Sequence, residues 1–381
     1  MSDSYKNSAN TPSKQTLTKY IAMALLALLS FGLTGLGAIV VMFALSTLRA
    51  GRDSAASHGI SSRNSSRLGG VAIVITFILF LIGMVLLSSY TPGVVRDVTF
   101  LHVWSTVFVC VILGGAEDIK ADLLSPYFRL VVKLLAFGFF LWTTPNVVPL
   151  VIGIPGIDYL LSVPLVAWGL CTIFCVGFIN AFNMADGANG LIPGIATIAF
   201  GILFLVYGRP AEGVLFFVCL MFLIFNVVSG WFFLGDMGSY GLGAALVCYG
   251  LLGVAQGDFS AGFMASLLSY PCVDFLVSVI RRLRKGLSPL QADNGHLHNR
   301  LYSFYAPKFK SRVTPNSLTG LTISSGSSGV SLIIYVFDWI AIDSNTWFGI
   351  FGIQVVVYLI ILSRLRRTQM NQSELIIGMS S

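Results

Sequence analysis

The sequence predicts an all-α membrane protein that crosses a bilayer about eleven times. Of its 381 residues, 56% are hydrophobic and 10% are charged, whereas soluble domains carry about a quarter charged residues. Apolar runs near the length that a helix needs to cross a bilayer, roughly 20 residues, recur along the whole chain. Because lipid offers the backbone no hydrogen-bond partners, these runs are expected to be helices.

The expected spans form a single membrane domain with a tail at each end. In chain order they cover about 20–47, 70–88, 98–116, 128–144, 160–180, 191–207, 211–229, 240–256, 261–280, 320–341 and 346–363. Residues 1–18, rich in Ser, Thr, Asn and Lys, are expected to be a disordered tail. The membrane domain would cover 19–363, with a long cytoplasmic loop at 281–319 and a basic cytoplasmic tail at 364–381. The SSGSS stretch at 324–328 is expected to be disordered unless it lies in a helix.

Positive charge predicts the orientation of the chain in the membrane. The segments between the spans are numbered here as loops 1 to 10. Most of the 23 lysine and arginine residues fall in loops 1, 3 and 9 and in the C-terminal tail. The positive-inside rule therefore places the odd loops and the C-terminus in the cytoplasm and the N-terminus outside. Basic residues in these positions explain the net charge of +7 without a nucleic-acid partner.

Clusters of polar residues that could catalyse a reaction or bind a ligand also fall in the odd loops. Loop 1 ends SSRNSSRLGG, loop 3 reads GGAEDIKADLLSPYFRL, loop 5 reads NAFNMADGANGL, loop 7 reads GWFFLGDMGSYGLG and loop 9 contains RRLRKGLSPLQADNGHLHNRL. The even loops hold few polar residues. The coincidence of polar clusters with the basic side predicts one active site at the cytoplasmic face.

Loop 3 begins with two adjacent carboxylates, Glu117 and Asp118, at the end of a span. Neighbouring like charges raise one pKa and attract cations, which favours proton transfer or metal binding. The alternative is a solvated helix end in which the acids pair with Lys120.

Loop 5 places a polar side chain at every third position: Asn180, Asn183, Asp186 and Asn189. If the preceding helix continued, these residues would form one oblique polar row on its surface. Their carbonyl and carboxylate oxygens suit Mg²⁺. The alternative is a polar turn with a helix cap.

Loop 7 carries Asp236 among glycines, whose backbone amides could face an anion. The alternative is a hairpin that Asp236 caps.

Loop 9 contains two of the four histidines, His296 and His298. Their alternation in HLHNR predicts an extended or turn segment with both imidazoles on one side. No third protein ligand is evident nearby, so phosphate binding together with Arg300 fits better than metal binding. The alternative is a pair of surface histidines. Upstream, Asp274 and the Arg281–Arg282 pair predict either a lipid-headgroup site or a snorkelling cluster.

Together, these loops offer groups for a divalent cation and for phosphates beside many apolar helices. This equipment suits a reaction between a phosphorylated lipid and a soluble phosphate donor, because phosphoryl transfer depends on positioning and on neutralising oxygen charge.

The same motifs resemble those of the polyprenyl-phosphate N-acetylhexosamine-1-phosphate transferases. The resemblance rests on SRLGG, GGAEDIKADLLSPYFRL, NAFNMADGANGL, LGDMGSYGLG and SPLQADNGHLHNRL, taken as a set, and covers about residues 50–305. The phospho-MurNAc-pentapeptide translocases are a related branch, but the HLHNRL segment favours the bacterial sugar-1-phosphate branch.

The resemblance implies a reaction and a location. Undecaprenyl phosphate would attack the β-phosphorus of a UDP-N-acetylhexosamine, with UDP-GlcNAc the expected donor, to give undecaprenyl-diphosphate-sugar and UMP. The enzyme would need Mg²⁺, with Mn²⁺ as a substitute, and would work in the bacterial inner membrane among membrane lipids. Its product would begin the synthesis of O-antigen or lipopolysaccharide, capsule or another exopolysaccharide, and a homodimer is the expected assembly by analogy.

The resemblance also implies roles for single residues. Asp236 would ligate Mg²⁺ with Asn183 as second ligand, and Glu117 with Asp118 would orient or deprotonate the lipid phosphate. The remaining expected contacts to nucleotide and phosphates are Asn180, Asp186, Asn189, Arg129, His296, His298 and Arg300, with Arg63 or Arg67 as additions. Asn189 would face the uracil, and Asp186 would support its loop.

Two positions depart from the family pattern. Glu117 stands where the family has Asp, which moves the carboxylate by about one bond and makes Asp118 the stronger candidate for the base. Asn299 replaces a histidine, and an amide donates a hydrogen bond but carries no charge. Two other functions stay open: a transporter or flippase for a lipid or anion, and an inactive homologue that scaffolds glycan assembly.

Overall fold

The computed structural model describes residues 14–46, 66–87, 98–120, 123–288 and 294–380, with only the backbone described at the outermost ends of some helices. These residues form helices and no β-strand; one isolated bridge joins Ser66 to Phe232. The α-helices are α1 (Lys14–Ser46), α2 (Gly69–Leu87), α3 (Val98–Ile119), α4 (Pro126–Thr143), α5 (Pro155–Leu161), α6 (Pro164–Met184), α7 (Leu191–Tyr207), α8 (Pro210–Ser229), α9 (Gly235–Gln256), α10 (Ala261–Leu267), α11 (Ser269–Arg284), α12 (Leu297–Tyr305), α13 (Val313–Ser324), α14 (Val330–Val336) and α15 (Trp347–Ser380). Short 3-10 turns lie at Pro145–Val147 and Ala306–Lys308, and a π-helix lies at Ser325–Gly329.

The long helices confirm an all-α protein with multiple membrane-spanning segments. Among the described residues, eight helices are long and apolar enough to cross a membrane: α1, α3, α4, α6, α8, α9, the α13–α14 unit and α15. The α10–α11 pair would be a ninth span, broken by a bend of 79°. Shorter apolar helices lie at Gly69–Ile82 and Leu191–Tyr207. Each of the eleven expected spans therefore coincides with a helix or a helix pair, while eleven crossings stay a prediction.

Several expected segment boundaries are corrected by the helices. Residues 14–18 belong to α1, because a helix nucleated in an apolar run extends easily into its flank. The expected loop at 281–319 contains α12 and the start of α13. The SSGSS stretch continues from α13 into α14 as a π-helix. The C-terminal tail after residue 363 is a continuation of α15. Residues 1–13 lie outside the described chain.

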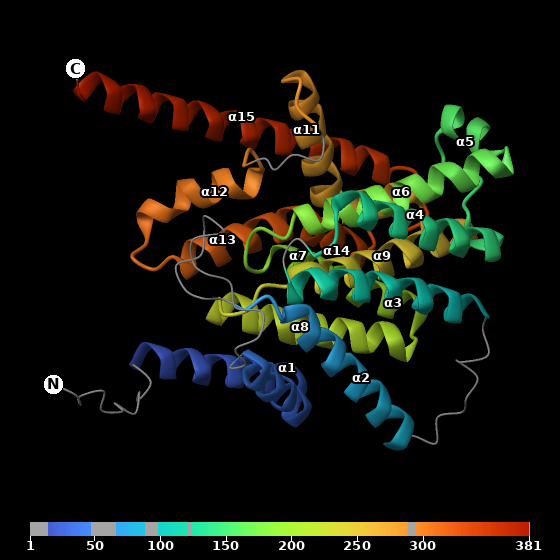
Figure 1. The fold of residues 1–381 in the computed structure, drawn as a ribbon, viewed down its shortest axis with the longest axis horizontal. Helices are drawn as coiled ribbons and strands as arrows, with labels where there is room; N and C mark the ends of the chain where they lie inside the picture. Colours follow the sequence, from blue (N-terminus) through green and yellow to red (C-terminus); the bar gives the residue numbers. More distant parts are fainter. Residues whose placement is uncertain (1–13, 47–65, 88–97, 121–122, 289–293, 381) are drawn as a thin grey trace.

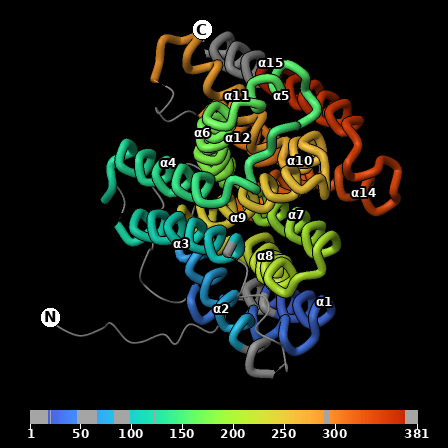
Figure 2. The backbone as a smooth tube through the Cα atoms, turned by 90° about the vertical axis from the view of Figure 1, so that its right-hand side faces the viewer, coloured from blue at the N-terminus to red at the C-terminus, as the bar shows by residue number. Residues whose placement is uncertain are grey.

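Helix α9 forms the centre of the molecule. Every residue from Gly238 to Gly253 is buried, and Figure 2 shows α3, α4, α6, α7 and α8 around α9. Its small residues let neighbouring helices approach closely; a Cβ added at Gly241 would lie 2.7 Å from Val111 of α3. The central helix is thus held firmly, and its ends can position groups at either face of the bundle.

The outer helices carry large exposed apolar side chains. Examples are Trp142 (69% exposed) on α4 and Leu165 (67% exposed) on α6. In water such surfaces would be a liability, whereas lipid tails are as apolar as these side chains. The exposed faces therefore agree with a bundle surrounded by lipid.

Loops 6, 8 and 10 meet at one end of the bundle. Tyr207 after α7 donates to Asp258 after α9, with 2.8 Å between Oη and Oδ2. Ser260 donates to the carbonyl of Ser344 at 3.0 Å. In Figure 1 this end lies at the right, and α12 and the start of α13 lie at the left. Successive long helices therefore alternate in direction, which leaves the odd loops together at the left end.

Candidate active site

Loops 1, 3 and 7 are joined by backbone and side-chain hydrogen bonds at the N-terminus of α9. The amide of Ser66 donates to the carbonyl of Trp231 at 3.0 Å, and the amide of Phe233 donates to the carbonyl of Ser66 at 3.0 Å. Asp118, in the last turn of α3, accepts from the amides of Asp236 at 2.9 Å and Met237 at 2.8 Å. The predicted acidic pair and the predicted metal ligand Asp236 are therefore neighbours.

The Asp118 carboxylate acts as the cap of α9. Both of its oxygens accept hydrogen bonds from amides in the first turn, where a negative charge is favourable. The fit is tight, since a Cβ at Gly235 would come within 2.6 Å of Asp118 Oδ2 and its φ is +73°. Asp118 thus holds Asp236 in place, a task that the sequence did not reveal.

Glu117 takes part in a different set of contacts. Its Oε1 accepts from the amide of Leu124 at 2.7 Å, and its Oε2 lies 3.5 Å from Arg129 Nη1. The extra methylene of glutamate lets the carboxylate reach over the loop to this amide. Arg129 Nη1 also lies 3.4 Å from Asp236 Oδ2. Arg129 therefore bridges Glu117 and Asp236, and the predicted site residue is confirmed as a neighbour of both acids.

Asn183 lies beside Asp236, as the predicted ligand pair requires. Its side-chain amide donates to Asp236 Oδ1 at 2.8 Å and to Ser239 Oγ at 2.8 Å. The side chain of Asp236 is 29% exposed, so it is open to a ligand or an ion. Asn183 and Asp236 thus form one polar pair between α6 and α9.

A buried lysine extends this cluster toward the interior of the bundle. Lys133 of α4 is 1% exposed; its Nζ donates to Asn180 Oδ1 and lies 4.2 Å from the ring centroid of Tyr240. Lys133 was not assigned to the site from the sequence. The available signal was its position four residues after Arg129, which puts both cations on one helix face, inside an apolar span.

The polar row expected in loop 5 does not form, because α6 ends at Met184. Asn180 and Asn183 lie on the helix, whereas Asp186 and Asn189 follow in the turn. Asp186 is half-buried near two other acids. Burial and the charges of Asp236 and Asp118 raise the pKa of Asp186 to about 8, against the opposing effect of the Gly235 amide.

Asn189 lies in a buried group of three asparagines. Its amide donates to Asn316 Oδ1 at 3.1 Å, and its Oδ1 accepts from Asn226 Nδ2 at 3.4 Å. Asn226 Oδ1 also accepts from the amide of Gly190 at 2.6 Å. These bonds hold the loop to α8 and α13. A contact between Asn189 and uracil stays a prediction.

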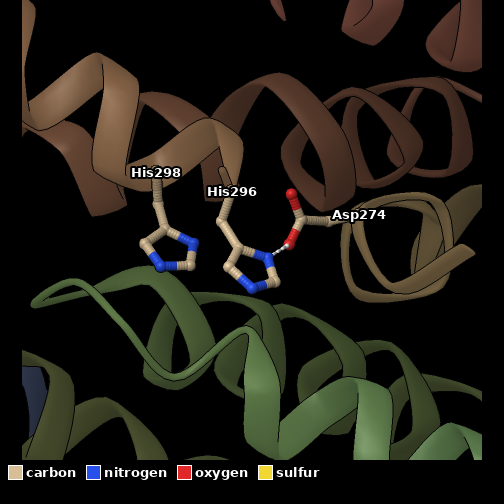
Figure 3. Close-up of side chains that lie close together, drawn as sticks. All are labelled: Asp274, His296 and His298. Atoms are coloured by element: carbon tan, nitrogen blue, oxygen red, sulfur yellow. Dashed lines mark hydrogen bonds and ion pairs between the residues drawn. The ribbon is translucent and has the colours of Figure 1, made fainter. Parts of the chain in front are cut away.

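The two histidines lie at the start of α12, not in an extended segment. His296 is the N-cap residue and His298 is in the first turn. Their rings are nonetheless on one side, stacked at 5.2 Å between centroids with 11° between planes. Figure 3 shows both rings directed from α12 toward the green part of the chain, which holds α6 and the loop after it. Arg300 follows in the same turn.

A third residue, Asp274 of α11, completes this cluster. Its Oδ2 lies 2.5 Å from His296 Nδ1 (Figure 3), and ligand atoms of Asp274, His296 and His298 all lie within 4.8 Å of one another. The expectation that no third partner lies near the histidines is therefore wrong. The available signal was a carboxylate within an apolar span.

Loop 5 and loop 9 meet where Gly187 packs on His298. A Cβ at Gly187 would lie 2.1 Å from His298 Nε2, while the hydroxyl of Tyr270 lies 3.0 Å from His298 Nδ1. Burial lowers the pKa of His298 to about 4, although the Asp274 charge opposes the shift. His298 is therefore neutral at neutral pH. Because Asp186 and Gly187 are consecutive, loop 5 links the acidic cluster to the histidines.

Of the two arginines of loop 1 that were predicted to bind phosphate, the structure describes only Arg67. Arg67 is close enough for its charge to act on Asp118. Arg63 lies outside the described residues.

The fold and this site define a multi-pass helical membrane protein with acids, amides, imidazoles and arginines gathered at one end. A family model described as "Glycosyl transferase family 4" matches residues 100–254, which include Glu117, Asp118, loop 5 and Asp236. This match supports an assignment of residues 100–254 to glycosyl transferase family 4.

Curated relatives come from both branches of this family. The chain is 37% identical over 135 residues to a phospho-N-acetylmuramoyl-pentapeptide-transferase of Synechococcus sp. (strain JA-2-3B'a(2-13)), covering 34% of this chain and 39% of the relative. It is 33% identical over 127 residues to the undecaprenyl-phosphate alpha-N-acetylglucosaminyl 1-phosphate transferase of Thermotoga maritima, covering 33% and 40%. It is 23% identical over 318 residues to a probable undecaprenyl-phosphate N-acetylglucosaminyl 1-phosphate transferase of Bacillus subtilis, covering 80% and 81%. The Synechococcus match and those to three further pentapeptide-transferases span 39% to 63% of these relatives' own lengths.

Proposed function

We propose that this protein transfers an N-acetylhexosamine-1-phosphate, with GlcNAc-1-phosphate the expected group, from a UDP-sugar to undecaprenyl phosphate. An oxygen of the lipid phosphate attacks the β-phosphorus of the donor. The bond from that phosphorus to the bridging oxygen breaks, and UMP leaves with that oxygen. Relatives named as undecaprenyl-phosphate N-acetylglucosaminyl 1-phosphate transferases support this reaction.

One observation carries the proposal: consecutive residues Asp186 and Gly187 join two clusters of opposite character. Asp118 and Asp236 are near enough for their charges to act on Asp186, and Gly187 packs on His298. A reaction that brings two phosphates together near a cation needs such an arrangement, with anionic groups for the cation and donors for phosphate oxygens.

The acidic cluster fits a divalent cation. Burial, together with the nearby charges of Asp236 and Asp118, raises the pKa of Asp186 to about 8. Asp236 and Asn183 would hold Mg²⁺, for which Mn²⁺ could substitute. When bound, the ion neutralises charge on the donor diphosphate.

The chain's own residues supply the other tasks. Arg129 and Lys133 place two positive charges beside Asp236 and Asn180, where the lipid phosphate would be held. His296, His298 and Arg300 would contact the donor diphosphate from the opposite side. Glu117 and Asp118 would orient the lipid phosphate or accept its proton, as the resemblance implies.

The expected setting is the bacterial inner membrane, with the odd loops and the C-terminus in the cytoplasm and the N-terminus in the periplasm. Because the donor is a soluble nucleotide and the acceptor is a lipid, a site at one end of the bundle can reach both. The product would begin assembly of O-antigen or another surface polysaccharide.

The test is UMP release by the full-length protein, purified in detergent, with undecaprenyl phosphate, Mg²⁺ and a panel of UDP-sugars. We expect UMP from one UDP-N-acetylhexosamine and its loss on adding EDTA. Asp236→Asn should abolish release, whereas Asp258→Asn, at the other end of α9, should not. No UMP from any donor, with folded protein, would refute the proposed reaction and favour a transporter or a scaffold.

A further inference from the structure

Asp274 is a buried carboxylate that the proposed reaction has not yet used. It is 1% exposed and lies on α11, shortly after the 79° bend that separates α10 from α11. Its Oδ1 accepts from the amide of Leu297 at 3.1 Å and from the hydroxyl of Tyr358 at 2.7 Å. Its Oδ2 faces His296 Nδ1 at 2.5 Å. All four residues lie outside the segment 100–254 that matches the family model.

The spacing identifies a hydrogen bond and not a shared metal ion. Two ligands on a tetrahedral zinc with bonds of 2.0–2.1 Å would lie roughly 3.3 Å apart. The 2.5 Å between Asp274 Oδ2 and His296 Nδ1 is shorter than that. An ionised carboxylate accepts hydrogen bonds only, so the proton must lie on Nδ1. The tautomer of His296 is therefore determined by Asp274.

The remaining contacts keep the carboxylate from turning. The Leu297 amide and the Tyr358 hydroxyl both donate to Oδ1, which leaves Oδ2 for the imidazole. In Figure 3 the second ring nitrogen of His296 points away from Asp274, toward the green part of the chain with α6 and the loop after it. That loop carries Asp186 and Gly187. The ring thus presents Nε2 on the side of this part of the chain.

We propose that Asp274, locked by Tyr358 of the last span, is a positioning residue that holds the proton of His296 on Nδ1 and directs Nε2 to the phosphate groups of the donor. The proposal rests on the proposed function. When Nε2 takes up a proton, the carboxylate stabilises the imidazolium, which can then donate to a phosphate oxygen. His298 has no carboxylate on its Nδ1, which faces the Tyr270 hydroxyl. The two histidines therefore differ in role, because only His296 has a carboxylate on its Nδ1.

The geometry makes Asp274→Asn a sharp test. The two donors on Oδ1 will keep the amide oxygen in that place, so the amide nitrogen must face His296. An NH₂ group donates, which forces Nδ1 to accept and moves the ring proton to Nε2. The variant keeps the size and burial of the side chain. Tyr358→Phe is the milder change, because it removes one donor and keeps the charge.

The matched control is Asp258→Asn. Asp258 is also a carboxylate that accepts from a tyrosine, with 2.8 Å from Tyr207 Oη to Oδ2. It follows the C-terminus of α9, about 30 Å from the site by the length of that helix. The same chemical change is thus made at the opposite end of the bundle.

The first readout is ¹⁵N NMR of the imidazoles in full-length protein labelled at histidine. The chain has four histidines, so His296→Gln assigns the signal of interest. We expect the proton on Nδ1 in the wild type and in Asp258→Asn, and on Nε2 in Asp274→Asn. This experiment needs no turnover and holds even if the proposed reaction is wrong. A wild-type proton on Nε2, or an unchanged tautomer in Asp274→Asn, would overturn the proposal.

The second readout is the kinetics of UMP release. We expect Asp274→Asn to lower kcat/KM for the UDP-sugar by about 100-fold, the scale of a lost proton-transfer or charged donor group, and Tyr358→Phe to lower it less. If Asp274→Asn keeps the kcat/KM of the wild type while Asp236→Asn is inactive, the role of Asp274 is refuted and the proposed function stands. If the wild type itself releases no UMP, the proposed function fails and the NMR result still decides the tautomer.

Discussion

Gly187 lies so close to His298 that a Cβ at position 187 would come within 2.1 Å of the imidazole Nε2. This contact joins loop 5 to loop 9, which are separated in sequence by four long helices. His298 is buried and is held from its other side by Tyr270, so the ring has little room to move. Any side chain at position 187 must therefore displace either the loop or the ring.

We predict that Gly187→Ala lowers the proposed transferase activity by at least tenfold with a modest loss of stability. Displacement of the ring moves a group that faces the donor diphosphate, and misplacements of about 1 Å can cost 100-fold in rate. UMP release and the thermal midpoint in detergent measure the two effects. Gly177→Ala in α6 is the control, because a Cβ there meets nothing within 4 Å and alanine favours a helix. Equal activity in both variants would show that the contact has no role in catalysis.

The hydrogen bonds of Asp118 predict a structural cost for its removal. In Asp118→Asn, the amide oxygen can accept from the Asp236 or the Met237 amide, and the NH₂ group then faces the other one. One buried donor is left without a partner, which costs on the order of 1–3 kcal/mol. We expect a lower thermal midpoint together with lost activity. Asp236→Asn should lose activity at an almost unchanged midpoint. A fully stable but inactive Asp118→Asn would instead mark Asp118 as the base.

Most of the fold could be predicted from hydrophobic runs, because lipid permits few structures for a span. All eleven runs became helices or helix pairs, and the polar clusters of the odd loops did gather at one end. The ends of the helices were harder to predict. For loop 5 a continued helix and a capped turn were both open, and α6 ends at Met184. Polar side chains at every third position occur both on a helix and in a turn whose polar residues cap the helix ends, so this spacing does not distinguish the two.

The contacts within the site depend on side chains that are distant in sequence. Asp118 and Asp236 are a pair only because α3 packs along α9, and no spacing in the sequence records this. Asp274 and Lys133 had a signal, since each is a charge within an apolar run. The sequence alone indicated only a headgroup site or a snorkelling cluster for Asp274. A buried charge in a span needs a named partner before its role can be judged.

Lys133 donates to Asn180 Oδ1, and this contact suggests the next experiment. Lys133→Met removes the charge and keeps the length of the side chain, which avoids leaving a buried charge without a partner. We expect at least a 100-fold loss of UMP release, because the variant lacks the ammonium group that would bind the lipid phosphate beside Asn180 and Asp236. Stability should change little. Lys285→Met, at an exposed position after α11, is the control and should retain activity. Retained activity in Lys133→Met would show that Lys133 only packs against Tyr240.

The lowered pKa of His298 predicts how stability depends on pH. Burial lowers this pKa from the ordinary 6.5 to about 4, so the unfolded chain takes up a proton at a higher pH than the folded protein. The contribution of His298 to stability is therefore complete above about pH 6.5 and is lost as the pH falls toward about 4. His298→Gln cannot titrate and should remove this part of the dependence. Thermal unfolding in detergent between pH 7.5 and 4.5 measures it. We expect the midpoint of the wild type to fall further than that of the variant. Parallel curves for the two proteins would show that folding does not lower the pKa of His298.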